Sequence, residues 1–306
     1  MPDSELICAA PAKLNLFLHV LGRRADGYHL LETVFRFVDF GDTLHLQLRN
    51  DGRIVRSRIL DGVPESQDLC VRAAQLLKAQ SGTVLGVDLA LQKRLPMGGG
   101  LGGGSSDAAS VLLGLNQLWG LHWSRQRLQL LALQLGADVP VFIYGQSAFA
   151  QGIGEDLLPV MLMPAWYLVL IPPVQVSTAK IFAHQQLTRD SKTIRMTDFS
   201  GADSGADSGA DIVGIFKAGK LTAEQLINLT RNDLQAVVCA DYPVVGEYLA
   251  WLNHYAPARM TGSGACVFAS FTDEVAAQQV LSVLPVGMRG FVARGLDRHP
   301  HEDWAS

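Results

Sequence analysis

The chain has 306 residues, 48% of them hydrophobic, and a formal net charge of −4 at pH 7, which suits about two domains and excludes a broadly basic nucleic-acid-binding surface. No apolar run approaches the ~20 residues of a membrane span and the acidic start lacks a secretory signal, so a cytoplasmic protein is expected, with no nucleic-acid or membrane partner. The four cysteines form no C-x-x-C pair, which argues against a disulfide framework and a zinc site.

The first half of the chain predicts alternating strands and helices. Residues 13–20 alternate between two faces, so they predict a half-buried strand with Lys13 and Asn15 on the same side. A turn is expected at 24–27, where Asp and Gly favour reversal of the chain. The other predicted elements are strands at 33–38 and 43–48, a helix at 69–80, a strand at 84–91, helices at 108–119 and 124–135, and a strand at 147–151.

Glycines and prolines at 152–164 indicate a boundary between an N-terminal domain (1–158) and a C-terminal domain (159–306). The segment 201–211 repeats Gly-Ala-Asp-Ser and predicts a mobile surface loop, because its spacing does not suit a calcium loop. Both parts mix strands and helices, which predicts an α+β protein. The elements predicted after the boundary are a strand at 166–171, helices at 177–186, 223–229 and 244–254, a glycine turn at 261–264, a strand at 265–271, a helix from residue 273 and a strand near 290–294.

A glycine-rich segment at 95–107 stands directly before the predicted helix at 108–119. It carries six glycines and two serines in thirteen residues. Glycine permits positive φ, so backbone N–H groups can converge on one point, and the N-terminus of the helix adds its positive dipole there. The segment therefore predicts a phosphate-binding loop and a nucleotide ligand.

Two common phosphate-binding loops do not fit this segment. Gly98, Gly100 and Gly103 satisfy G-x-G-x-x-G, but the ribose-binding acid expected about 20 residues further on is missing. A Walker A loop needs a lysine before its Ser/Thr, and none occurs between Lys93 and Lys180. The phosphates are therefore expected to bind backbone amides, the helix N-terminus, serine hydroxyls and a metal ion.

Five motifs in order resemble those of the GHMP kinases, the superfamily of galactokinase, homoserine kinase and mevalonate kinase. The resemblance implies a two-domain GHMP kinase fold, with a ribosomal-protein-like N-terminal α+β domain, a ferredoxin-like C-terminal domain and the active site in the cleft between them. It also implies an ATP-dependent small-molecule kinase. The motifs are PAKLNL (11–16), RADGYH (24–29), PMGGGLGGGSS (96–106), GADVP (136–140) and TGSGA (261–265).

Within the superfamily, the chain is most similar to kinases that phosphorylate a cytidine-diphosphate-linked polyol. That resemblance implies transfer to the 2-hydroxyl of a cytidyl-linked methylerythritol, a step of non-mevalonate isoprenoid precursor biosynthesis. Two alternatives stay open: a sister kinase acting on mevalonate, homoserine or a sugar, and a nucleotide-binding module without activity. Tyr28, His29 and Phe182 favour the first hypothesis, because the small substrates offer no aromatic base to stack.

Phosphoryl transfer to an alcohol requires a group that removes the hydroxyl proton. Asp138 is the candidate base, although a residue before Pro140 is also placed to cap a helix that begins at Val139. The resemblance favours catalysis by Asp138. Lys13 is expected to keep this carboxylate ionised and to lower the pKa of the hydroxyl; alone, a strand lysine can also be a solvated edge charge.

Five side chains are expected to bind the substrate. Asn15 shares the face of the candidate lysine, so it is expected to orient the substrate. The resemblance implies that Tyr28 and Phe182 stack on the two faces of cytosine while His29 hydrogen-bonds its polar edge. For Tyr28 the alternative is packing on the core beside the turn. Thr178 is expected to contact the substrate, although a helix cap would look the same.

The second glycine turn is expected to complete the phosphate cage, with a simple hairpin turn as its alternative. Mg²⁺ is expected to bridge the phosphates with one or two protein oxygens, for which only Ser106 is a candidate. Asp68 stands where the superfamily branch more often has Asn near the nucleotide base. The predicted ATP-binding residues are Pro96, Met97, Gly98, Gly99, Gly100, Leu101, Gly102, Gly103, Gly104, Ser105, Ser106, Gly262, Ser263 and Gly264.

Overall fold

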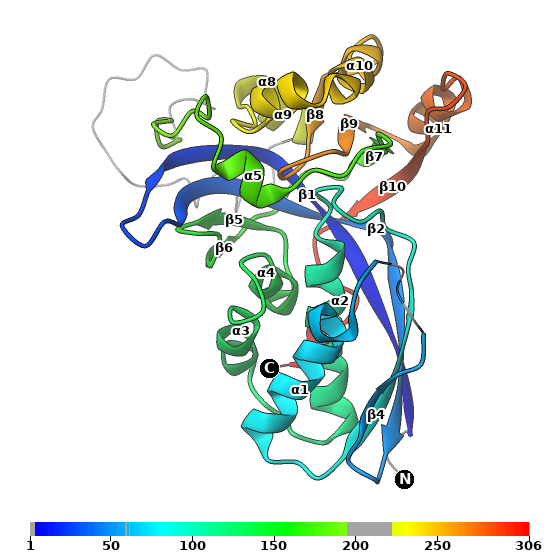
Figure 1. The fold of residues 1–306 in the computed structure, drawn as a ribbon. Coiled ribbons are helices and arrows are strands. Elements are labelled where there is room, and N and C mark those ends of the chain that lie inside the picture. The colour runs from blue at the N-terminus through cyan, green and yellow to red at the C-terminus, as the bar shows by residue number, and fades with distance from the viewer. Residues whose placement is uncertain (1–3, 59, 61, 195–221, 306) are drawn as a thin grey trace.

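Two long antiparallel strands, β1 (Glu5–Arg23) and β2 (His29–Arg49), run through both halves of the molecule (Figure 1). The computed structural model describes residues 4–58, 60, 62–194 and 222–305, so the repeat at 201–211 lies outside the described residues. The other elements of the first half are β3 (Ile54–Arg56), α1 (Leu69–Ser81), β4 (Gly86–Gln92), α2 (Gly103–Leu118), α3 (Arg125–Ala132), α4 (Val139–Tyr144), β5 (Ala148–Gln151) and β6 (Asp156–Pro159).

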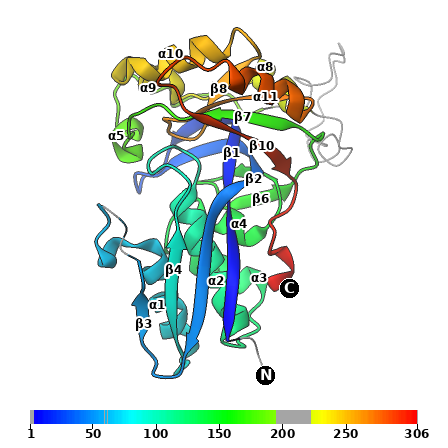
Figure 2. The same ribbon diagram turned by 90° about the vertical axis from the view of Figure 1, so that its right-hand side faces the viewer.

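The second half adds strands to the same sheet. Its strand β10 pairs with β7 and, at its end, with β2, so the sheet runs without a break in the order β3-β4-β2-β10-β7-β9-β8. Figure 2 shows β1, β2 and β4 in front of α1 and α2, which cover one face of the sheet. The elements of this half are β7 (Trp166–Leu170), α5 (Thr178–Phe182), α8 (Ala223–Leu229), α9 (Gln235–Asp241), α10 (Pro243–Leu252), β8 (Ala258–Met260), β9 (Val267–Phe271), α11 (Glu274–Ser282) and β10 (Gly290–Leu296).

The strands predicted separately at 33–38 and 43–48 are one strand, β2, so the predicted interruption is wrong. Pairing with β1 continues through a bulge, where Pro11 lies opposite Gly41 but Ala12 lies opposite Val38. A Cβ on Gly41 would lie 2.1 Å from the carbonyl oxygen of Ala10. Glycine therefore marks a close approach of two strands here rather than the end of one.

Strand β1 is buried on both faces. Leu14 and Leu16 face the apolar core as predicted, but Lys13 and Asn15 are each only 2% exposed, so the prediction of a half-buried strand is wrong. The reason is that loops from both halves cover the polar face of β1. The backbone N–H of Lys13 donates to the carbonyl of Leu101 at 3.0 Å, and that of Asn15 to Thr261 Oγ1 at 2.9 Å.

The predicted helix at 69–80 is confirmed as α1, while the helix predicted at 177–186 is only the short α5. Local sequence patterns did not indicate the short strands β3 and β8 or the helix α9. Within the predicted boundary region 152–164, residues 156–159 form β6, which pairs with β5. Among the described residues, no helix combines the length and the apolar character that crossing a bilayer would require.

The end of the chain leaves β10 and packs on the N-terminal half, so the boundary at 158/159 stays a prediction. The Arg125 guanidinium donates to the carbonyl oxygens of Ile143 at 2.6 Å and Ala305 at 2.7 Å. Nε2 of His301 accepts the backbone N–H of Ala9 at 2.7 Å. These bonds fix residues 301–305 against α3 and the start of β1.

His299 in this terminal segment predicts a loss of stability in acid. Its side chain is 2% exposed, and burial lowers its pKa to about 3, with the nearby His301 and Arg125 acting in the same direction. In the unfolded chain a histidine is protonated below about pH 6.5. In the folded protein His299 stays neutral at the same pH, so acid favours the unfolded state. The free energy of unfolding therefore decreases by up to about 1.4 kcal/mol per pH unit from this group.

The variant His299→Asn isolates this contribution. Asparagine keeps an acceptor for the backbone N–H of His301, which lies 3.1 Å from His299 Nδ1, and it does not titrate. Urea unfolding measured from neutral to acidic pH is expected to show a shallower pH dependence in the variant than in the wild type. Identical slopes would mean that His299 binds its proton as readily in the folded protein as in the unfolded chain.

Candidate active site

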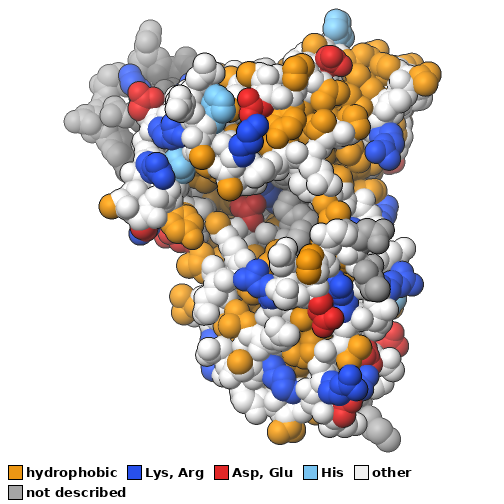
Figure 3. Space-filling model, in the orientation of Figure 1, with side chains coloured by type: hydrophobic (Ala, Val, Ile, Leu, Met, Phe, Trp, Pro, Cys, Tyr) orange, Lys and Arg blue, Asp and Glu red, His pale blue; other side chains and the backbone are white. Residues whose placement is uncertain are grey.

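A cavity of ≈ 570 Å³ lies between the two halves of the molecule. Figure 3 shows it as a hollow with acidic side chains visible inside. Its walls come from β1, β2, the glycine-rich loop, the residue before α4, the helix α5 and the turn residues Gly262 and Ser263. Gly264, predicted to bind ATP with them, is not among the lining residues. Segments distant in the sequence thus converge on one site.

The glycine-rich loop forms the wall next to α2. Gly98, Gly100 and Gly102 have φ of +68°, +75° and +71°, a conformation that L side chains rarely adopt. The loop runs directly into α2, whose first residue is Gly103, so the amide groups of the first helical turn lie at the cavity. The loop and the helix together have the features of an anion-binding site.

The second glycine turn docks on this loop. The backbone N–H of Cys266 donates to the carbonyl of Gly99 at 3.1 Å. A Cβ on Gly100 would lie 2.2 Å from the carbonyl oxygen of Thr261, so the two segments approach as closely as only glycine permits. Gly262 and Ser263 line the cavity from this side.

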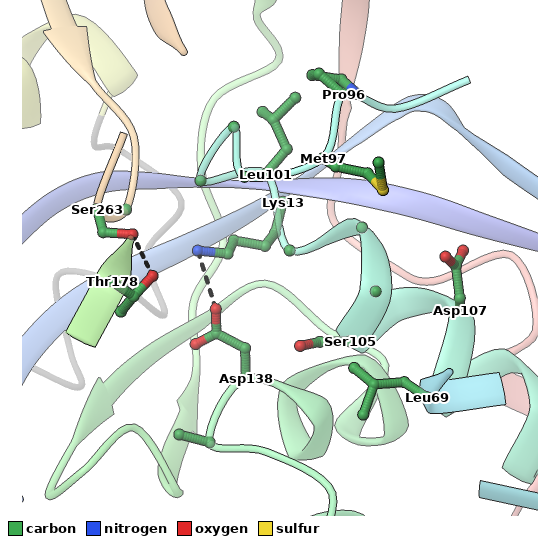
Figure 4. A pocket seen from close by; sticks show the side chains of 18 of the residues that line it. Lys13, Leu69, Pro96, Met97, Leu101, Ser105, Asp107, Asp138, Thr178 and Ser263 are labelled. Atoms are coloured by element: carbon green, nitrogen blue, oxygen red, sulfur yellow. Dashed lines mark hydrogen bonds and ion pairs between the residues drawn. The ribbon is translucent and has the colours of Figure 1, made fainter. Parts of the chain in front are cut away.

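Lys13 and Asp138 point toward one another beside the loop (Figure 4). Lys13 Nζ lies 3.2 Å from Asp138 Oδ2; the lysine side chain is 3% exposed and the aspartate side chain 40%. Lys13 also donates to Asn15 Oδ1, and Asn15 Nδ2 donates to Thr33 Oγ1 at 2.9 Å. The ammonium is therefore held in position from one side and presented to an accessible carboxylate on the other.

The alternative role for Asp138, a side-chain cap of α4, is wrong. Asp138 occupies the N-cap position, but its carboxylate accepts no capping hydrogen bond. The alternative for Lys13, a solvated edge charge, is excluded by its burial. Asp138 therefore does not serve as a helix cap, and Lys13 is not a solvated charge at a strand edge.

Three of the five residues expected to bind the substrate, Asn15, Thr178 and Phe182, line the cavity. Phe182 and Thr178 of α5 line the cavity, and Thr178 Oγ1 lies 2.7 Å from Ser263 Oγ. Thr178 does not cap the helix, because Ser177 fills that role. The rings of His29 and Phe182 lie 5.0 Å apart at 33°. Neither His29 nor Tyr28 is among the residues that line the cavity, and Tyr28 is 58% exposed, which excludes packing on the core.

Ser106 does not face the cavity, in contrast to the expectation for a phosphate or metal ligand. It is fully buried, and its hydroxyl donates to the carbonyl of Pro11 at 2.7 Å, which fixes α2 to β1. Ser105 lines the cavity instead. Asp68 lines it too, but its carboxylate already accepts the Cys70 N–H at 2.8 Å.

A charged cluster that no sequence motif indicated lies behind the loop. Lys93 Nζ lies 2.8 Å from Asp107 Oδ2 and 2.5 Å from Asp42 Oδ2, and Asp42 also accepts the backbone N–H of Leu95 at 2.8 Å. Burial raises the pKa of Asp107 to about 8, against the opposing effect of the Lys93 ammonium. The one available signal was Asp107, which directly follows the two serines of the loop. The cluster anchors the start of the loop to β2.

Comparison with known proteins agrees with this geometry. Residues 68–146 match the model of the GHMP kinases N terminal domain, and residues 219–286 match that of the GHMP kinases C terminal domain. A homoserine kinase structure from Cytophaga hutchinsonii, 16% identical with a TM-score of 0.67, covers 98% of this chain, which covers 96% of that one. The fold and the site together define an ATP-dependent GHMP kinase.

Proteins with higher sequence identity show to which family of GHMP kinases the chain belongs. A 4-diphosphocytidyl-2-C-methyl-D-erythritol kinase from Nitrosospira multiformis is 56% identical over 306 residues, which span 99% of this chain and 95% of the relative. One from Thiobacillus denitrificans is 56% identical over 96% of this chain and 97% of its own. A crystal structure of 4-(cytidine 5'-diphospho)-2C-methyl-D-erythritol kinase, 31% identical, has a TM-score of 0.73 and covers 95% of this chain, which covers 99% of that one. The chain belongs to the 4-diphosphocytidyl-2-C-methyl-D-erythritol kinase family.

Proposed function

We propose that this protein transfers the γ-phosphoryl group of ATP to the 2-hydroxyl of 4-diphosphocytidyl-2-C-methyl-D-erythritol, with ADP as the second product. The observation that carries the proposal is the ion pair between Lys13 and Asp138 at 3.2 Å, beside a glycine-rich loop in a single cavity. The names of the relatives at 56% identity support the choice of substrate.

The pair supplies the proton transfer that the reaction requires. Asp138 accepts the hydroxyl proton as the oxygen attacks the γ-phosphorus. Lys13 favours the ionised form of this carboxylate and stabilises the negative charge that develops on the attacking oxygen. The buried ammonium does not need to reorganise during the reaction, because Asn15 already holds it.

The loop amides and the N-terminus of α2 bind the phosphates and spread their charge. Mg²⁺ fits the donor set of the cavity, because the hydroxyl of Ser105 offers the kind of hard oxygen ligand that this ion prefers. When bound, it neutralises phosphate charge. Within the part of the chain that the structure describes, no three His, Cys, Asp or Glu side chains group as a metal site, which suits an ion held mainly by the nucleotide.

The cytosine base is proposed to lie at the pair formed by His29 and Phe182, with Thr178 contacting the substrate nearby. Tyr28 is proposed to cover the free face of the base, because it stands at the tip of the β1–β2 hairpin next to His29. An exposed tyrosine in this place gains buried area only when the base arrives.

A coupled ADP-release assay tests the proposed substrate. The purified protein is offered the cytidyl-linked methylerythritol, mevalonate, homoserine and galactose, each with ATP and Mg²⁺. Turnover is expected with the first compound alone, because only that compound carries a base for the aromatic pair. Turnover restricted to any of the other three would contradict the proposal and favour a sister kinase.

A further inference from the structure

Arg189 connects the two sides of the proposed base site, and no sequence pattern pointed to it. Nη2 of its guanidinium donates to the carbonyl oxygens of Phe182 at 2.9 Å and His184 at 2.8 Å, and Nη1 to that of Leu187 at 3.2 Å. Its Nε–H donates to His29 Nε2 at 3.2 Å. One half-buried side chain thus ties the end of α5 to the start of β2.

These bonds fix the position of the His29 ring relative to the Phe182 ring. His29 comes from the hairpin of the first half, whereas Phe182 comes from α5 of the second. Their rings lie 5.0 Å apart, and Arg189 bonds to the side chain of one and the backbone of the other. The relative position of the two rings therefore depends on this arginine.

The bond to Nε2 also decides where His29 carries its proton. A guanidinium only donates, so Nε2 must accept, and the neutral imidazole then has its hydrogen on Nδ1. Burial is the main cause that lowers the pKa of His29, and the cations Arg189 and Arg23 lower it further. Among the residues that the structure describes, no hydrogen-bond partner meets Nδ1.

We infer that Arg189 is a positioning residue that holds His29 as the Nδ1–H tautomer, so that this ring presents one hydrogen-bond donor to the acceptor edge of a pyrimidine. The inference rests on the proposed function, which supplies the base. Cytosine has an unprotonated N3, whereas uracil carries an N–H at that position. A donor fixed in this way therefore favours cytosine over uracil.

The first test compares kinetics for the cytidine-linked substrate and its uridine-linked analogue. In Arg189→Met, kcat/KM for the cytidine-linked substrate is expected to fall on the order of tenfold, through KM, as one hydrogen bond is lost. The kcat/KM for the uridine-linked analogue is expected to fall less, so the ratio of the two kcat/KM values decreases. The values of kcat and of KM for ATP stay near those of the wild type.

Two further variants separate this role from a general effect on folding. Arg189→Lys keeps the positive charge but not the planar fork of donors, so it is expected to restore only part of the base preference. Arg24→Met is the matched control, since Arg24 pairs with the exposed Asp26 at 2.9 Å on the same hairpin. Both kinetic constants and the base preference should be unchanged in this control.

The second test reads the tautomer directly. Nitrogen NMR of histidine-labelled protein is expected to show Nδ1–H for His29 in the wild type, and a shift toward Nε2–H with a raised pKa in Arg189→Met. An unchanged tautomer and an unchanged base preference in that variant overturn the role of Arg189 alone. A wild-type protein that phosphorylates only mevalonate, homoserine or galactose overturns the proposed function instead.

Discussion

Replacing Asp138 by Asn is expected to lower kcat on the order of 1,000-fold, the size of effect that a positioned general base supplies. The amide keeps the shape of the carboxylate but cannot accept the hydroxyl proton. Lys13 remains anchored by Asn15, so the phosphate loop should keep its conformation. Steady-state ADP release measures the loss, while calorimetric titration with a non-hydrolysable ATP analogue should give nearly the wild-type affinity.

Asp156→Asn is the matched control for this variant, because that carboxylate is exposed on β6. It should retain the wild-type rate. The free energy of unfolding of Asp138→Asn is expected to decrease, because the buried ammonium of Lys13 loses its charged partner. A kcat within about tenfold of the wild type would contradict the assignment of Asp138 as the base.

Replacing Gly100 by Ala is expected to lower kcat/KM for ATP about 100-fold, because small displacements of a positioning loop have effects of that size. The new Cβ would lie 2.2 Å from the carbonyl oxygen of Thr261. This neighbour is backbone in the second glycine turn, so it cannot rotate away, and the loop must move. The change should appear in the ATP titration as well as in turnover.

Gly82→Ala separates this collision from the strain of a positive φ. Gly82 has φ of +69°, but a Cβ there would meet no atom within 4 Å. The expected cost of that conformation is about 1 kcal/mol of stability, with no change in kinetics. If both variants showed the same modest loss of stability and unaltered kinetics, close contact between the turns would not control ATP binding.

Local sequence patterns predicted much of the fold but not its longest elements. Helix α1 matched its periodicity, whereas β2 appeared as two strands because the Gly41 region reads as a break. A bulge preserves the pairing of strands while disturbing the alternation, so single-sequence patterns do not distinguish it from a turn. The burial of the polar face of β1 could not be predicted from local sequence either, because the loops that cover it contain Leu101 and Thr261, which are far away along the chain.

Some features of the candidate site could also be predicted from local sequence, and others could not. The shared face of Lys13 and Asn15 followed from strand alternation, but their approach to Asp138 depends on the fold, and only the resemblance indicated it. Ser106 was predicted as a phosphate or metal ligand, but Ser105 lines the cavity instead. Adjacent residues of a helix point about 100° apart around its axis, so only one of the two serines can face the cavity. Arg189 lay outside every motif, since its four acceptors are defined by the end of a helix and by a hairpin far away in sequence.

The shared strands constrain how substrates enter. β1 and β2 pass from one half to the other, and β10 joins them by pairing with β2. Two lobes connected by an unbroken ladder cannot swing apart as lobes on a flexible linker do, because such bending would break hydrogen bonds within the sheet. Reactants are therefore expected to enter, and products to leave, without a large relative movement of the two halves.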